Sequence, residues 1–75
     1  MSQDIPTVLA GFWQELLDVD AVRPGDTLLE VGGNSLIATM LANRIELTWN
    51  VRPSMADLMT SSFAEICQLC RPAPA

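Results

Sequence analysis

The N-terminal part of the chain carries apolar side chains at steps of three and four residues, the spacing of one helix face. The positions in this stripe are Val8, Leu9, Phe12, Leu16 and Val19, widened by Trp13 and Leu17. Asp4 can cap the start, and Pro6 is tolerated in a first turn. The pattern predicts a helix from about Ile5 to Asp18.

The segment from Asp20 to Gly33 has the character of a connection. Arg23-Pro24-Gly25-Asp26 has turn composition, because Pro sets φ and Gly permits unusual backbone angles. A connection this long in so small a domain must be attached to the core or serve a function. Gly32-Gly33 permits a sharp bend at its end. Three apolar residues can attach it to the core, namely Leu28, Leu29 and Val31.

Three further helices follow. The second is expected from about Ser35 to Thr48, with Ala38 and Ala42 beside its apolar stripe. A short third helix over 54–59 begins at the capping pair Ser54–Asp57, and the last helix, over 63–69, begins at the box Ser62–Glu65. The apolar stripe of the last helix is Phe63, Ile66, Cys67 and Cys70.

No segment shows strand alternation over more than a few residues. The predicted fold is therefore all-α: a small four-helix bundle, with three main helices, one short helix and a long first loop. We expect one domain over 5–70, an N-terminal tail at 1–4, and a C-terminal tail or linker stub at 71–75. In the expected core, Ile37, Leu41 and Ile45 face inward. Their expected partners are Phe12, Leu16, Leu58 and Ile66.

The composition of the chain disfavours several classes of function. The chain has 75 residues and a net charge of −5, with nine acids and four arginines but no lysine or histidine. Such a surface disfavours nucleic acid and suits either a partner with a basic face or simple solubility. The N-terminus lacks the basic region of a signal peptide, and no apolar run approaches the roughly 18 residues of a membrane span. We expect a cytoplasmic protein with no membrane contact, and so short a chain favours a carrying module over an enzyme.

Cys67 and Cys70 form a lone Cys-x-x-Cys pair. Without a histidine or a third cysteine they cannot complete a four-ligand zinc site, so no metal site is expected. A redox pair of the thioredoxin kind needs a βαβ setting, which this sequence lacks. The pair is interpreted as small apolar residues of the last helix.

The stretch from Leu28 to Ile37 carries the candidate chemistry. Two glycines and Asn34 deliver Ser35 to the start of a helix, where free N–H groups and a partial positive charge favour a phosphate ester. The alternative is that Asn34 or Ser35 is only an N-cap. A catalytic serine is disfavoured, because the chain has no histidine, lysine or tyrosine to act with it.

From Val8 to Ile66 the sequence resembles phosphopantetheine-binding carrier domains, especially the peptidyl carriers of nonribosomal peptide synthetases and related polyketide-pathway carriers. The attachment motif of that family is matched by Asp26, Leu28-Leu29, Val31, Gly32-Gly33, Asn34, Ser35 and Leu36. Matches elsewhere are Trp13, Leu16-Leu17, Arg44-Ile45, Val51-Arg52-Pro53, Asp57-Leu58, Ser62 and Glu65-Ile66. Asn34 departs from the usual His or Asp, and Leu28-Leu29 replaces an aromatic pair.

The resemblance implies a covalent 4'-phosphopantetheine on Ser35, taken from coenzyme A by a phosphopantetheinyl transferase, with Gly33, Asn34 and Leu36 around the attachment point. The arm would carry acyl or aminoacyl thioesters to adenylating, acyltransferase or condensing enzymes of nonribosomal peptide or polyketide biosynthesis. The chain itself would be non-catalytic. The family's partners dock on the second helix and the preceding loop.

The phase of the second helix extends this expectation to a partner surface. If Ile37, Leu41 and Ile45 are buried, the residues on the opposite side lie next to Ser35. The predicted partner-binding set is Val31, Leu36, Thr39, Met40, Asn43 and Arg44. Glu30 and Glu46 could steer a basic partner. The alternative for Met40 is that it packs sideways into the core.

Our first interpretation is a discrete, monomeric carrier in bacterial secondary metabolism, although an excised domain of a longer protein would look the same. The rival class is a helical interaction module without a prosthetic group. A fatty-acid-type acyl carrier would share the chemistry.

Overall fold

The computed structural model describes residues 4–71, which form four helices in chain order. Their bounds are α1, Ile5–Leu17; α2, Ser35–Trp49; α3, Met55–Thr60; and α4, Phe63–Leu69. Within residues 4–71 the β structure is limited to an isolated bridge between Thr27 and Ser62. The all-α prediction is confirmed, with helix ends within one residue of those expected. At seven residues, α4 is hardly longer than the six-residue α3.

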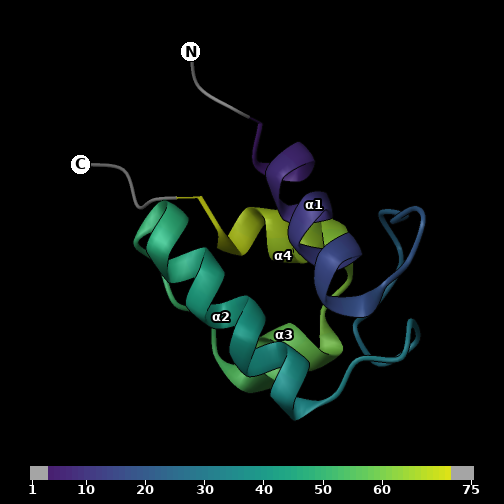
Figure 1. Cartoon of the computed structure of the whole chain (residues 1–75). Helices are drawn as coiled ribbons and strands as arrows, with labels where there is room; N and C mark the ends of the chain where they lie inside the picture. The colour runs from purple at the N-terminus through teal and green to yellow at the C-terminus, as the bar shows by residue number, and fades with distance from the viewer. Residues whose placement is uncertain (1–3, 72–75) are drawn as a thin grey trace.

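Figure 1 shows how the helices are arranged. α1 packs on α2 and on α4, and α3 packs on α2. The start of α2, with the end of the long connection, lies at the bottom of the view, whereas the first turn of α1 lies at the top. None of the helices within residues 4–71 combines the length and apolar character that a membrane crossing needs. The predicted domain limits stay a prediction, and the tails fall largely outside the described residues.

The core draws on all four helices and on the connection. Its buried apolar residues are Leu9, Trp13, Leu28, Ala38, Leu41, Ala42, Ile45, Leu58, Phe63, Ile66, Cys67 and Cys70. The inward orientation of Leu41 and Ile45 is confirmed. Ile37, Phe12 and Leu16 are only partly buried and pack against this core from its edge.

The sequence therefore predicted the wrong α1 residues for the buried side of that helix. Leu9 and Trp13, one turn apart, form the buried ridge, and Phe12 lies beside it. Trp13 occupies the interior because its ring meets Phe63 edge-on, with centroids 5.3 Å apart. Phe12 instead packs against the half-buried Trp49 at 5.9 Å.

The helix starts follow the capping signals with one exception. Ser62 and Glu65 form the complete reciprocal box at α4, and the Ser54 side chain accepts the Asp57 N–H at α3. Asp4 stands at the N-cap position of α1, but its carboxylate accepts no backbone N–H. It accepts the Thr7 hydroxyl at 3.5 Å instead, so the expected side-chain cap is absent there.

The long connection is attached to α4 by the backbone. The N–H of Phe63 donates to Asp26 O at 2.7 Å, and the N–H of Ala64 donates to Pro24 O at 3.0 Å. Leu28 is fully buried. The expectation that Leu29 also attaches the loop is wrong, because its side chain is 56% exposed.

Candidate attachment site and docking face

The start of α2 separates the capping residue from the candidate attachment residue. Asn34 is the N-cap, and its Oδ1 accepts the Ile37 N–H at 3.0 Å. Ser35 is the first helical residue and is exposed, and within residues 4–71 its hydroxyl makes no hydrogen bond. The alternative that Ser35 is the cap is therefore wrong. Because Asn34 does the capping, the Ser35 hydroxyl is available for chemistry.

The loop before Ser35 is shaped by a reciprocal pair that the sequence analysis did not use. Glu30 Oε1 accepts both the N–H and the hydroxyl of Thr27, at 3.1 and 3.0 Å, and the Glu30 N–H donates to Thr27 Oγ1 at 3.3 Å. The signal was present as Thr-x-x-Glu, the same spacing as the Ser62–Glu65 box. This turn directs Leu28 inward and leaves Leu29 outside.

The two glycines serve different needs. Gly32 has φ +94°, a left-handed conformation that other residues rarely adopt. Gly33 donates its N–H to Leu28 O at 2.7 Å, and a Cβ on it would lie 2.5 Å from Leu28 Cγ. The chain thus turns tightly over a buried leucine, which fixes the position of Ser35 relative to the core.

The local field suits a phosphate group on Ser35. α2 has fifteen residues and no acidic residue in its first turn. The partial positive charge of a helix N-terminus is confined to that turn and favours an anion there. An exposed hydroxyl with no carboxylate on its own turn therefore fits a phosphate-linked prosthetic group.

The outer side of α2 carries an exposed apolar stripe. Leu36, Met40 and Leu47 are 67%, 40% and 88% exposed. At about 100° per residue they lie within about 40° of one another, opposite the buried side. Met55 of α3 extends the patch, because its Sδ lies 3.7 Å from Thr39 Oγ1. The alternative that Met40 packs into the core is wrong.

Sequence reasoning identified only part of this surface. Leu47 and Met55 are exposed apolar residues that it did not place there. The helical phase could have found Leu47, since it follows Met40 by seven residues. Of the predicted set, Val31 is half-buried and packs against the core. Asn43 is exposed, and its Oδ1 accepts from Arg52, which also pairs with Glu46 at 3.0 Å.

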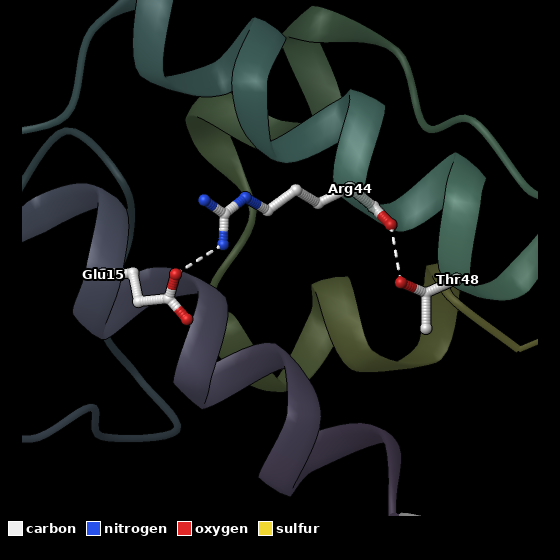
Figure 2. Close-up of polar contacts among 3 residues, drawn as sticks. All are labelled: Glu15, Arg44 and Thr48. Carbon is white, nitrogen blue, oxygen red and sulfur yellow. Dashed lines mark hydrogen bonds and ion pairs between the residues drawn. The ribbon is translucent and has the colours of Figure 1, made fainter.

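Arg44, another predicted partner residue, is engaged within the fold. Its Nη1 lies 2.8 Å from Glu15 Oε2 on α1, and its guanidinium lies over the Phe12 ring at 5.6 Å. Figure 2 shows this side chain reaching across to α1, while Thr48 donates to the Arg44 carbonyl on the same helix. Arg44 therefore connects α1 to α2 at the edge of the apolar stripe.

The two cysteines lie in the interior. Burial raises the pKa of Cys67, and burial together with the neighbouring Cys67 raises the pKa of Cys70 to about 12. Both thiols are free and buried. Among residues 4–71, no group of three or more Cys, Asp or Glu residues could hold a metal ion. The pair thus behaves as the small apolar residues that were predicted.

The chain is similar in sequence to one protein family and to several known proteins. The family described as "Phosphopantetheine attachment site" matches residues 7–70. Malpinin synthetase from Mortierella alpina is 40% identical over 63 residues, which are 83% of this chain and 1% of the relative. Phosphinothricin tripeptide synthetase PhsC from Streptomyces viridochromogenes is 35% identical over 66 residues, 76% of this chain and 6% of the relative.

A third relative, nonribosomal peptide synthetase 5 from Aspergillus fumigatus, is 35% identical over 57 residues, 71% of this chain and 3% of the relative. The chain therefore spans 6% or less of these three relatives. No solved structure matches. The match over residues 7–70 confirms the family expected from the motif, and the chain belongs to the phosphopantetheine attachment-site family, whose prosthetic group is 4'-phosphopantetheine.

Proposed function

We propose that this chain is a non-catalytic carrier that bears 4'-phosphopantetheine on Ser35 and holds aminoacyl or peptidyl intermediates as thioesters in nonribosomal peptide biosynthesis. One observation carries the assignment to Ser35. Its hydroxyl is exposed at the first position of α2 and uncommitted, because Asn34 supplies the cap. The peptide-synthetase names of the relatives support the pathway.

The residues around Ser35 support this role. The prosthetic group would supply a thiol on a long arm, and the chain would supply its anchor. The N-terminus of α2 would stabilise the phosphate that links this group to Ser35. Gly33 leaves the loop closed against Leu28, so the anchor stays in one place relative to the core. The non-catalytic assignment is supported by the inventory of side chains, since the sequence has no histidine, lysine or tyrosine to act as a general base.

The outer side of α2 is the proposed docking face for the transferase and for adenylating, condensing or acyltransferase partners. It includes the predicted Leu36, Thr39, Met40 and Asn43, with Val31 and Arg44 at its edges. We add Leu47 and Met55, which are 88% and 39% exposed. Exposed apolar side chains bordered by polar ones match the anatomy of a small transient interface. The monomeric state and cytoplasmic location stay predictions.

Charging experiments test this function. The holo protein, prepared with coenzyme A and a broad-specificity transferase, is offered to adenylating enzymes with amino acids and to an acyltransferase with malonyl-coenzyme A. We expect an aminoacyl thioester on the holo protein and none on the apo protein or on Ser35→Ala. Charging by the acyltransferase alone would favour a polyketide or fatty-acid role. A chain that no transferase modifies would support the interaction-module rival.

A further inference from the structure

A pocket of about 230 Å³ lies between the first turn of α1, Pro24 of the long connection and α4. Its apolar lining includes Ile5, Pro6, Phe63, Ala64 and Cys67. An apolar cavity of about 150 Å³ is enough to hold a benzene ring. This pocket therefore has room for one large apolar side chain.

The pocket differs in charge from the rest of the protein. Arg71 is the one charged residue among those lining it, although the chain as a whole carries −5. Within residues 4–71, Arg44 and Arg52 are in ion pairs with acids, whereas Arg23 and Arg71 are in none. Glu65 lies nearby on α4, but its carboxylate accepts the Ser62 N–H at 2.8 Å. A carboxylate on a ligand would thus find an available cation at the rim.

The pocket also lies far from the candidate attachment site. Figure 1 shows the first turn of α1 at the end of the molecule opposite the start of α2, where Ser35 lies. A partner seated in the pocket would therefore leave Ser35 and the outer side of α2 accessible. Gln68 adds an exposed amide at the rim, which can both donate to and accept from a peptide backbone. This favours a protein segment over a simple fatty acid.

We propose that the pocket between α1 and α4 is a second docking site, which takes a partner-protein segment with one large apolar side chain next to a carboxylate. The apolar side chain enters between Ile5, Phe63 and Cys67, and the carboxylate pairs with Arg71. A partner bound in this pocket would hold the domain while a second enzyme contacts the start of α2. The binding itself does not depend on the arm, so this proposal goes beyond the proposed function.

The test uses the peptide acetyl-Glu-Phe-Pro-amide and its matched partner acetyl-Gln-Phe-Pro-amide. Each is titrated into the nitrogen-15-labelled protein while amide chemical shifts are followed. We expect shifts in the first turn of α1 and in α4, with binding about two- to fivefold weaker for the Gln peptide and for Arg71→Gln, as for an exposed ion pair. Ser35→Ala and the holo protein should bind like the wild type, which separates this result from the fate of the proposed function.

A pocket-filling variant provides the control. Ala64→Trp should abolish the shifts, whereas Ala56→Trp, at an exposed alanine of α3 outside the pocket, should not. Thermal melting checks that both variants fold. Shifts that persist in Ala64→Trp, that fall on the outer side of α2, or that are equal for both peptides would overturn the proposal. Absence of shifts, or decanoate binding there more tightly than the Glu peptide, would also overturn it.

Discussion

The two sides of α2 are both apolar, and they differ in what covers them. Ala38, Leu41, Ala42 and Ile45 are sealed by the rest of the core, whereas Leu36, Met40 and Leu47 face outward. An ordinary surface helix pairs one apolar side with a polar one. The buried side of α2 serves folding, and the exposed apolar side is the one that we propose contacts a partner. The hydrophobicity of the residues alone does not distinguish the buried side of α2 from the exposed side. Their positions around the helix do distinguish them.

Two leucines of the same helix provide the strongest test of this difference. Leu41→Ala should lower the free energy of unfolding by about 2–5 kcal/mol, because it opens a cavity in the core. Leu47→Ala is the matched control and should change it by no more than about 0.5 kcal/mol. Urea unfolding measures both. Similar losses from the two variants would show that the sides of α2 have been wrongly assigned.

Cys70 lies in the core that the inner side of α2 faces. We expect its thiol to make the free energy of unfolding depend on pH. The pKa of its thiol is about 12 in the folded protein, against an ordinary 9.0. Above pH 9 the unfolded chain loses this proton while the folded chain keeps it, so stability should fall as the pH rises from about 9 toward 12. The sequence has no lysine or tyrosine to titrate in this range, and Cys67, whose pKa burial also raises, acts in the same direction. Denaturant unfolding at pH 8 and pH 10.5 should show the loss, and Cys70→Ala should reduce it; an equal slope in that variant would contradict the assignment.

Arg44 lies between the two sides of α2. Its substitution should lower the free energy of unfolding less than the changes above. Its ion pair with Glu15 is partly exposed, and such pairs contribute about 0.2–1 kcal/mol. We expect Arg44→Gln to lose about that amount in urea unfolding. In a double-mutant cycle, Glu15→Gln introduced into the Arg44→Gln variant should lower the free energy of unfolding little further. Fully additive losses would mean that the two side chains do not interact in solution.

Met40→Glu should have the smallest effect on stability, within about 0.5 kcal/mol, because the side chain is exposed. It places a charge in the middle of the apolar stripe, so charging of the holo protein by its partner enzyme should slow. Ala21→Glu, which adds the same charge at an exposed residue outside α2, is the comparison variant and should leave charging unchanged. Charging kinetics and thermal melting are measured together. Unchanged charging with an unchanged melt would exclude Met40 from the interface.

The sequence predicted features that depend on near neighbours in the chain. Helix ends came within one residue because Asn34, Ser54 and Ser62 are local capping signals. Apolar periodicity did not separate Leu28 from Leu29, and the local signal that does, the Thr27–Glu30 turn, was present in the sequence but was not used.

Features that depend on distant contacts were missed. Trp13 and Phe12 both fit a broad apolar stripe, and only the contact of Trp13 with Phe63, fifty residues later, selects the buried one. The pocket combines the first turn of α1 with α4, two segments at opposite ends of the chain. Periodicity describes one helix at a time and contains no such information.

Tandem mass spectrometry locates the residue that bears the prosthetic group and so tests its attachment to Ser35. Wild type, Ser35→Ala and Ser54→Ala are each incubated with coenzyme A, magnesium and a broad-specificity transferase. We expect one phosphopantetheine on wild type and on Ser54→Ala, located on Ser35 in both, and none on a folded Ser35→Ala. A phosphopantetheine on Ser35→Ala, or on any other residue of the wild type, would contradict it.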